Sequence, residues 1–440
     1  MKKTAISGIK VYLITYFIGI ILFAFTLGPS STTWSKLMSS LFDFVFSKSG
    51  MIAIHILFIL LYGLFLISKY FISVYKNKGF KTALYQFFLR LILPIALIGY
   101  TLKFIIKNNN KEVFNYEWNY SAENKSEKSN KRYLQDAKIR GMNVYQIGRR
   151  KTIPINNLIK TNIEWVAVIP YFYQKDEKTK RINTPDSLGV WSQQDSAFIK
   201  DINKLHDKDL AVMIKPHLWM SSGWRSNINF EVKSDWNIWF SDYRKNMIHY
   251  ALMAQKTNAE LFCIGTELRS SLKEMPKKWL ELIKEIKAIY KGKLTYAANW
   301  DDPFEFTGFW GELHYIGIQA YYPLTKNSSP NLEEIKKGWD VHINGLKTLS
   351  STYNKPILFT EIGYRNDINA TKNPWEWGSV FKRLYKKKSD KTQQLAYQAL
   401  FEKLWNKDWF AGLFPWEWTS SDFPIYKKPS QNTITTWYGK

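Results

Sequence analysis

The sequence contains a single cysteine, Cys263, among 440 residues. One thiol excludes an intrachain disulfide framework and a zinc site built from several cysteines. The six histidines include no pair at metal-ligand spacing, so we expect neither His217 nor another histidine to bind a metal ion. A glycine-rich phosphate turn is also missing, since residues 146–150 read Gln-Ile-Gly-Arg-Arg after the first expected strand. The sequence therefore predicts chemistry without a metal or an organic cofactor.

Acidic residues are scarce, with 37 Asp and Glu against 62 Lys and Arg, and the formal net charge is +25. Such an excess fits contact with nucleic acid, contact with an anionic membrane, or a lysine-rich composition without a specific partner. No nucleic-acid-binding motif is present, so we expect no nucleic acid partner. Basic runs such as residues 382–388 are interpreted as solvated surface, with contact to anionic lipid as the alternative.

Charged residues are almost absent from three long runs near the N-terminus. Residues 11–28 carry no charge, residues 52–74 carry only Lys69, and residues 84–106 carry only Arg90 and Lys103. About 20 apolar residues cross a bilayer as a helix, so the sequence predicts three transmembrane helices and a lipid bilayer as partner. Two alternatives stay open, a cleaved signal peptide for the first run and a buried or interfacial helix for the third.

The placement of lysines predicts the orientation of these helices. Lysines precede the first run and fill the loop between the second and third, at Lys2, Lys3, Lys10, Lys69, Lys76, Lys78 and Lys81. The other loop, residues 29–50, has only Lys36 and Lys48. We therefore expect a multi-pass protein of the cell membrane, with everything after residue 106 on the outer side, periplasmic or extracellular.

Residues 107–136 are polar and charged without periodicity, which predicts a flexible linker. The expected organisation is a membrane anchor over 1–106, this linker, and a folded domain over 137–440. Aromatic residues make up 17% of the chain and include 19 Trp, which indicates a packed core.

The folded domain alternates short apolar runs with helical patterns. The expected strands are residues 142–146, 164–169, 210–215, 261–266, 294–298, 315–320, 356–361 and 410–415. Helical spacing places apolar faces on the segments between several of them, at Trp236, Trp239, Phe240, Tyr243 and Met247, at Trp279, Leu282, Ile283 and Ile286, and at Leu332, Ile335, Trp339, Ile343 and Leu346. Eight such units in about 300 residues predict an α/β fold, a (β/α)₈ barrel. A doubly wound open sheet is the alternative, disfavoured by the missing glycine-rich turn.

In such barrels the chemistry lies at the carboxyl ends of the strands. Glu267 and Glu361 end the fourth and seventh apolar runs, where a carboxylate is costly to bury unless it is used or paired. Two carboxylates at one barrel mouth are the groups that a glycosidase needs, one protonated and one ionised. Either glutamate alone would be interpreted as a surface charge or a partner of a nearby lysine.

Several motifs, in order, resemble glycoside hydrolase family 113, the β-mannanase-like family of the retaining clan A. They are Lys215-Pro216-His217 with Trp219, Phe262 to Leu268, Tyr296 to Trp300, and Phe359 to Tyr364. The resemblance covers residues 137–440 and implies that Glu267 is the acid/base and Glu361 the nucleophile. Thr266 stands where much of the clan has Asn, and its hydroxyl is expected to bond the sugar 2-OH.

The remaining candidate residues surround the two glutamates at the strand ends. Tyr321 is expected to hydrogen-bond the nucleophile, and its alternative is a rim aromatic. Arg225 is expected to contact substrate or to stabilise a carboxylate at the barrel mouth. The other expected substrate contacts are Lys215, His217, Trp219, Asn299, Trp300, Trp416 and Trp418.

The sequence thus predicts a membrane-anchored retaining glycosidase that cleaves a β-linked glycan, with β-1,4-mannan or glucomannan as the expected polymer. A non-hydrolytic glycan-binding or cell-envelope assembly protein on the same barrel is one alternative. A transglycosylase, which passes the same covalent intermediate to a sugar acceptor, is the other.

Overall fold

The computed structural model describes residues 9–18, 48–109, 122–149, 155–183, 191–302, 308–377 and 386–440. The chain divides into two compact units, Met1–Ile105 and Ile106–Lys440, which are described separately here. Of the three expected apolar helices, residues 19–28 of the first lie outside the described residues.

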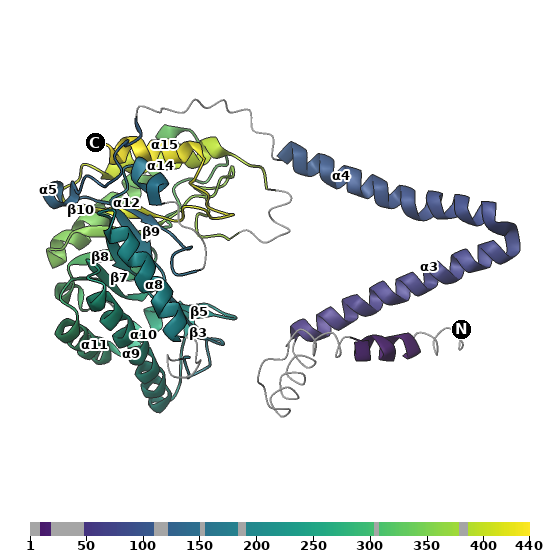
Figure 1. The fold of residues 1–440 in the computed structure, drawn as a ribbon, viewed down its shortest axis with the longest axis horizontal. Helices are drawn as coiled ribbons and strands as arrows, with labels where there is room; N and C mark the ends of the chain where they lie inside the picture. Colours follow the sequence, from purple (N-terminus) through teal and green to yellow (C-terminus); the bar gives the residue numbers. More distant parts are fainter. Residues whose placement is uncertain are drawn as a thin grey trace. The chain divides into compact units, whose positions relative to one another are not determined.

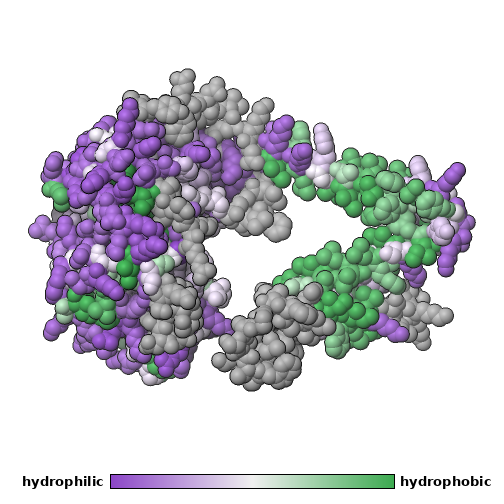
Figure 2. Space-filling view, in the orientation of Figure 1, coloured by the Kyte–Doolittle hydropathy of each residue, from purple (hydrophilic) through white to green (hydrophobic). Residues whose placement is uncertain are grey.

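The N-terminal unit contains a long apolar helical segment, shown in purple and blue in Figure 1. It consists of α3 (Lys48–Phe87), the π-helical turn η1 (Phe88–Ile92) and α4 (Leu93–Asn109). The stretch Gly50–Asn109 is long and apolar enough to cross a membrane, and apolar side chains cover most of α3 and α4 (Figure 2). Within the described residues it is the single segment with these properties, next to a shorter apolar helix over Ile9–Ile18.

Gly79 interrupts this segment, with φ of 76° and ψ of 171°. A positive φ is accessible to glycine because it has no Cβ, so the helix can break here. The two sides of the break contact each other: the Phe71 and Phe87 rings lie 5.2 Å apart, and Arg90 Nη1 donates to the Tyr70 hydroxyl over 2.7 Å. The segment is therefore a helical hairpin, which matches the separation of the expected runs 52–74 and 84–106.

The second unit is a closed barrel of eight parallel strands, as the sequence predicts. Their order around the barrel is β1-β10-β9-β8-β7-β6-β4-β2. The strands are β1 (Ile139–Asn143), β2 (Trp165–Val168), β4 (Ala211–Ile214), β6 (Leu261–Thr266), β7 (Lys293–Asn299), β8 (Tyr315–Gln319), β9 (Ile357–Ile362) and β10 (Phe410–Pro415).

Helices surround the barrel (Figure 1). They are α5 (Tyr133–Asp136), α6 (Ile155–Lys160), α8 (Trp191–His206), α9 (Lys233–Lys256), α10 (Arg269–Glu274), α11 (Pro276–Ile289), α12 (Leu332–Tyr353), α14 (Asp390–Leu404) and α15 (Pro429–Tyr438), with the 3₁₀ turns η3 (Arg225–Asn227) and η5 (Trp310–Glu312). The predicted apolar faces of α9 and α11 are fully buried, and so are Ile335, Trp339 and Leu346 of α12. These faces pack with the outward side chains of the strands into one core.

β1 begins at Ile139, three residues before the expected strand at 142–146. The difference comes from Arg140, whose charge conceals a strand position in the sequence. Arg140 is 1% exposed, and its Nη1 lies 3.4 Å from a carboxylate oxygen of the equally buried Glu164. Because this pair and a hydrogen bond to the Tyr438 carbonyl satisfy the guanidinium, it is tolerated in the barrel.

Two strands continue beyond the barrel as a separate parallel pair, β3 (Tyr171–Gln174) and β5 (His217–Met220). Pro170 separates β2 from β3, and Pro216 separates β4 from β5. Proline cannot donate to the ladder, so each strand is interrupted there and then resumes. In the register of this pair Tyr171 faces His217 and Tyr173 faces Trp219. The pair therefore extends one wall of the barrel mouth.

The predicted linker over 107–136 is shorter than expected, because its last part packs on the barrel. Asn124 N donates to the Lys160 carbonyl over 2.7 Å, and Ser129 Oγ to the Asp209 carbonyl over 2.6 Å. The Arg132 N–H donates to the Glu164 carboxylate over 2.7 Å. Residues 124–136 thus belong to the folded domain, and residues 110–121 lie outside the described residues.

Candidate active site

Glu361 lies near the end of β9 at the carboxyl-terminal mouth of the barrel, 5% exposed. Its Oε1 lies 2.6 Å from Lys215 Nζ, and its Oε2 accepts a hydrogen bond of 3.0 Å from the Tyr321 hydroxyl. His217 Nε2 lies 3.4 Å from Oε1. A carboxylate held by an ammonium and a hydroxyl donor is fixed in orientation and stabilised in its ionised form. The predicted hydrogen bond from Tyr321 is therefore present.

Lys215 follows β4 and continues its inward pattern, since Ala211 and Met213 face the barrel interior four and two residues earlier. Its side chain is fully buried, and burial lowers the pKa of the ammonium while the Glu361 carboxylate opposes that change. Nζ also donates to the Thr360 carbonyl over 3.1 Å. Lys215 therefore contacts the carboxylate from inside the barrel. The sequence-based assignment of Lys215 to substrate assumed a free side chain, and the side chain is not free.

His217 is also directed at the carboxylate rather than at open solvent. It is 4% exposed, and burial together with the nearby Lys215 charge holds the pKa of its imidazole well below the usual value. The ring is therefore neutral near pH 7. Its neighbours are the Tyr171 ring, at a centroid distance of 5.8 Å edge to face, and the parallel Trp416 ring at 6.4 Å.

Glu267 follows β6 directly and adopts a φ of 53°. Such a value is rare for a residue with a Cβ, and its backbone is held on both sides. The Glu267 N–H donates to the Ala297 carbonyl over 2.9 Å, and Ser226 Oγ donates to the Glu267 carbonyl over 2.7 Å. This turn directs the side chain from the end of β6 toward Arg225.

Glu267 is 3% exposed. Its carboxyl is paired with Arg225, whose Nη2 and Nε lie 2.7 and 3.1 Å from the same carboxylate oxygen. Burial raises the pKa of this carboxyl to about 7, Arg225 opposes the rise, and the charge of Glu361 adds to it. Because the charge of Glu361 affects the pKa of Glu267, the two carboxyls lie in one electrostatic site. The Arg225 contact follows the second of the two roles expected for it, stabilisation of a carboxylate at the mouth.

Aromatic rings surround these groups. Tyr171, Tyr321, Trp416 and Phe423 form a buried cluster at the mouth, with the half-buried Trp300 against it. Trp300 stacks on Trp375 at 5.3 Å, and Trp377 packs edge to face on Trp416 at 6.3 Å. Large exposed rings extend the surface on the β3–β5 side and after β9: Tyr173, Trp219, Trp224, Trp375 and Trp377.

Tyr171, Trp375 and Trp377 are not among the site residues predicted from the sequence. The two Trp of the Trp375-Glu376-Trp377 segment follow a strand outside any helical pattern, which is a signal that could have been used. Tyr171 is concealed by Pro170, because a proline predicts the end of the strand, whereas in the fold it only interrupts the strand.

Trp418 is a correction. It is expected from the sequence to contact substrate together with Trp416, but Trp418 is 0% exposed and packs on Tyr426 in the main core, with ring centroids 5.0 Å apart. Strand alternation does not apply to this pair, because β10 ends at Pro415 and the chain leaves the barrel before Trp416. The two rings therefore take different directions.

We expect Trp418→Ala to destabilise the folded domain by about 3–5 kcal/mol, because it removes a large fully buried side chain and leaves a cavity. Trp219→Ala is the matched control, since that ring is 52% exposed, and its stability should change little. Thermal and denaturant unfolding measure both. Equal stability of the two variants would contradict the burial of Trp418.

Asn299 and Thr266 lie at the mouth, where Asn299 already has a partner within the chain and the buried Thr266 hydroxyl has no hydrogen-bond partner in the described part of it. Asn299 Oδ1 accepts a hydrogen bond of 3.0 Å from the Trp300 N–H, which orders the turn after β7. The Thr266 hydroxyl lies beside the Cys263 thiol, and it opposes the rise of the thiol pKa to about 11 that burial causes. Among the described residues, no group of three His, Cys, Asp or Glu is placed to hold a metal ion.

Several buried polar groups at the mouth have no hydrogen-bond partner in the described part of the chain, among them Nε2 of Gln319, Nε1 of Trp416 and Oγ1 of Thr266. Gln319 is the register partner of Glu361 in the neighbouring strand, so it lies beside the carboxylate. A buried polar group without a partner is costly, and a ligand with hydroxyl groups at the mouth would satisfy these groups.

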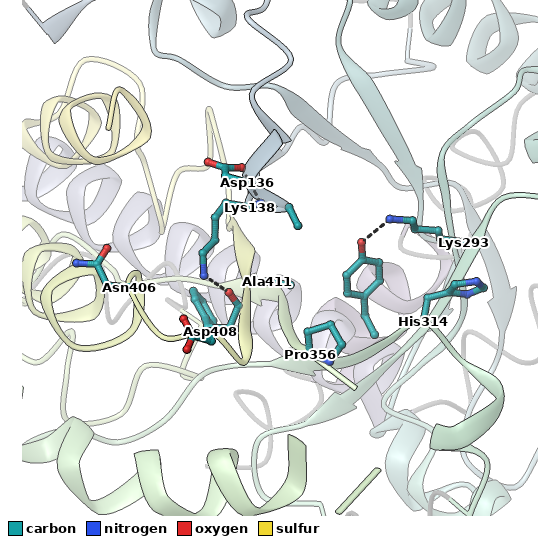
Figure 3. A pocket seen from close by; sticks show the side chains of 11 residues that line it. Asp136, Lys138, Lys293, His314, Pro356, Asn406, Asp408 and Ala411 are labelled. Carbon is teal, nitrogen blue, oxygen red and sulfur yellow. Dashed lines mark hydrogen bonds between the residues drawn. The ribbon is translucent and has the colours of Figure 1, made fainter. Parts of the chain in front are cut away.

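A cavity of about 520 Å³ lies at the opposite end of the barrel. It is lined by residues that precede or begin the strands, among them Lys138, Lys293 and His314 (Figure 3). Lys138 Nζ donates to the Lys407 carbonyl over 2.9 Å, and Lys293 Nζ to the Tyr315 hydroxyl over 3.1 Å. Because its basic groups already have partners and the paired glutamates lie at the other end, this cavity is not the candidate active site.

A model of the glycoside hydrolase family 113 matches residues 148–440. Among solved structures, a family 113 β-mannanase from Alicyclobacillus acidocaldarius in complex with ManMIm is 24% identical, with 68% of this chain and 96% of that chain covered and a TM-score of 0.58. A complex of a family 113 β-1,4-mannanase is also 24% identical and covers 68% and 98%, with a TM-score of 0.57. At 24% identity, the similarity to these two structures shows that this chain shares their fold. No curated protein matches the sequence significantly.

Proposed function

Because this chain belongs to glycoside hydrolase family 113, and is therefore a glycoside hydrolase, we propose that it cleaves β-1,4-linked mannan or glucomannan by a retaining double displacement. The observation that carries the proposal is the pair of buried glutamates at one barrel mouth, one bound to Lys215 and Tyr321 and the other to Arg225. The substrate assignment is supported by the similarity to β-mannanase structures.

In this proposal Glu361 is the nucleophile. Its contacts with Lys215 and Tyr321 favour the ionised carboxylate that must attack the anomeric carbon, and they fix the orientation of the attacking oxygen. When the carboxylate becomes an ester of the sugar its charge is lost, and Lys215 then remains as a buried cation. The ammonium therefore also favours the reverse of this step, which is the departure of the carboxylate from the sugar.

Glu267 is the proposed acid/base. It must be protonated to assist the leaving oxygen and ionised to activate water afterwards, so a pKa near the working pH suits both steps. Burial and the charge of Glu361 raise the pKa of Glu267, Arg225 opposes the rise, and the resulting pKa is about 7. A retaining mechanism requires the two carboxyls to lie about 5–5.5 Å apart in the working enzyme.

Arg225→Gln should move the alkaline limb of the kcat/KM profile to higher pH, by about 1–2 units. Arg225 favours the ionised form of Glu267, so its removal raises the pKa of the acid and keeps it protonated to higher pH. Arg244→Gln is the control, because Arg244 pairs with Glu285 on the outer helices. An unchanged limb, or a shift toward acid, would exclude Glu267 as the group behind that limb.

The rings around the mouth are proposed to bind sugar units. Trp300 on Trp375, and Trp219 on the β5 side, offer flat apolar faces, and the unpartnered donors of Gln319 and Trp416 offer hydrogen bonds to hydroxyls. A panel of β-mannan, glucomannan, cellulose, xylan and β-galactan, offered to the detergent-solubilised full chain, tests the substrate. Release of reducing ends from mannan and not from the others is expected, whereas cleavage of another polymer alone would overturn the assignment.

We propose further that residues 1–106 anchor the enzyme in the cell membrane with its barrel on the outer side. A straight helix over Gly50–Asn109 would measure about 90 Å, against a hydrocarbon core of about 30 Å. The break at Gly79 divides it into two runs, each of a length that spans once. Lys76, Lys78 and Lys81 flank the break, which favours the cytoplasm for that end.

An alkaline phosphatase fused after Lys111 should be active, and a cytoplasmic reporter at the same point inactive. The lysine asymmetry between the loops around residues 29–50 and 69–81 is the reason. Fusions after Lys78, in the loop at the break, serve as the internal control and should give the reverse pattern. The opposite result at Lys111 would place the barrel in the cytoplasm.

A further inference from the structure

Arg149 lies in the loop after β1, flat against two tyrosine rings. Its guanidinium carbon is 3.4 Å from the centroid of Tyr145 and 4.7 Å from that of Tyr171. Its guanidinium donates to the backbone carbonyls of Tyr145 and Ile169. The side chain is half-buried, so the guanidinium is held in a defined orientation while part of it stays accessible.

This guanidinium is close to the glutamate pair. The Tyr171 ring that it covers contacts the His217 ring, and His217 Nε2 lies 3.4 Å from Oε1 of Glu361. Burial lowers the pKa of His217, and the Arg149 charge adds to this, whereas burial raises the pKa of Glu417 and the Arg149 charge opposes that rise. Arg149 therefore acts on the same space as the two catalytic carboxyls of the proposed mechanism.

The other buried cations of this region are matched by carboxylates. Lys215 pairs with Glu361, and Arg225 pairs with Glu267. Arg149 forms no ion pair within the described ranges. The nearby Glu417 is engaged elsewhere, because its carboxylate oxygens accept hydrogen bonds of 3.0 Å from the N–H groups of Tyr145 and Thr419.

An oriented guanidinium without a carboxylate partner is suited to an oxyanion. Its planar fork can donate two parallel hydrogen bonds to a carboxylate, a sulfate or a phosphate, and the stacked rings hold the fork in place. A neutral glycan supplies no group of this kind. Because the positive charge of Arg149 lies beside the proposed sugar site, the property of the substrate that it would recognise is a negative charge.

We propose that Arg149 binds an acidic group carried by the glycan, so that the enzyme prefers an anionic β-linked polymer to neutral mannan. The inference rests on the proposed glycan hydrolysis at Glu267 and Glu361 and refines its substrate class. Arg149 is a specificity-determining residue in this proposal and takes no part in bond cleavage.

The test compares β-1,4-mannan with the same polymer partly oxidised at C6 to the uronate and with the polymer partly phosphorylated at C6. For the full chain in detergent we expect kcat/KM at low salt to be about 10-fold or more higher on an anionic polymer, since a charge-assisted bidentate contact contributes about 1.5–3 kcal/mol. The preference should fall as salt is added, because the contact is partly exposed.

Arg149→Gln should bring the ratio of the anionic to the neutral rate close to one, mainly through KM, and Arg149→Lys should retain part of it. Arg244→Gln, on the outer helices, should leave the ratio as in the parent protein. A purely structural role would lower both rates together with the thermal stability. Cleavage of neutral mannan without any anionic preference, or a preference that Arg149→Gln does not alter, would overturn this inference alone. Failure to cleave any of the three polymers would instead overturn the proposed mannan hydrolysis and this inference with it.

Discussion

Glu361→Ala is expected to lose turnover by a factor on the order of 10⁶, the loss seen when a catalytic nucleophile is removed. Without the carboxylate no glycosyl-enzyme intermediate forms. Azide, which is small enough to occupy the space of the lost carboxylate, should restore cleavage of a 2,4-dinitrophenyl β-glycoside and give the α-glycosyl azide. Nuclear magnetic resonance of that product measures the anomeric configuration.

The Glu361 variant needs a control for folding, because it leaves the buried Lys215 without its partner. Removing one member of a buried ion pair costs about 3–5 kcal/mol. Glu361→Gln keeps an oxygen for Lys215 and Tyr321 to bond, so it should be inactive and better folded. Glu285→Gln, at a half-buried glutamate on α11 that pairs with Arg244, should keep full activity. Wild-type release of the α-product first would show inversion and contradict the nucleophilic role.

Glu267→Ala is expected to reduce kcat/KM on polymer by about 10²–10⁴-fold, because protonation of the leaving oxygen is lost. An aryl glycoside with an acidic leaving group should be affected far less in its first step, since that group departs without a proton. Azide should then attack the accumulated intermediate and give the β-glycosyl azide, the opposite configuration from the Glu361→Ala reaction.

Steady-state and burst kinetics on a series of aryl glycosides measure this difference. The rate of Glu267→Ala should depend steeply on the leaving-group pKa, whereas that of the parent protein should depend on it weakly. Removal of Glu267 leaves Arg225 with a hydrogen bond to the Leu218 carbonyl, so a moderate loss of stability is expected as well. Equal losses on all leaving groups would exclude Glu267 as the general acid.

The barrel and the position of the two glutamates at its mouth could be predicted from the residue pattern alone. The sequence has eight apolar runs of strand length, and segments with a helical apolar face separate them. Few other arrangements bury both the strands and the apolar faces of the helices. Parallel strands place all their carboxyl ends at one mouth, so Glu267 and Glu361 had to come together once the runs were assigned.

The partner of each buried charged group could not be predicted in this way, because it depends on contacts between distant parts of the folded chain. Lys215 meets Glu361 across 146 residues of chain, and Arg225 meets Glu267 across 42. Both pairings depend on how loops return and on where proline interrupts the strands after Val168 and Ile214. Local periodicity carries no information about such contacts, and for this reason Lys215 was assigned to substrate on the sequence alone.

The same limit explains the remaining differences. Trp418 is buried because the chain turns after Pro415. Arg140 is tolerated in β1 because Glu164 is buried beside it. Glu164 in turn accepts a hydrogen bond from the Arg132 N–H of the predicted linker. A residue's charge or its spacing predicts the face that it prefers. Whether a buried charge is tolerated depends on a partner that is distant in sequence, and only the folded chain brings that partner within a few ångströms.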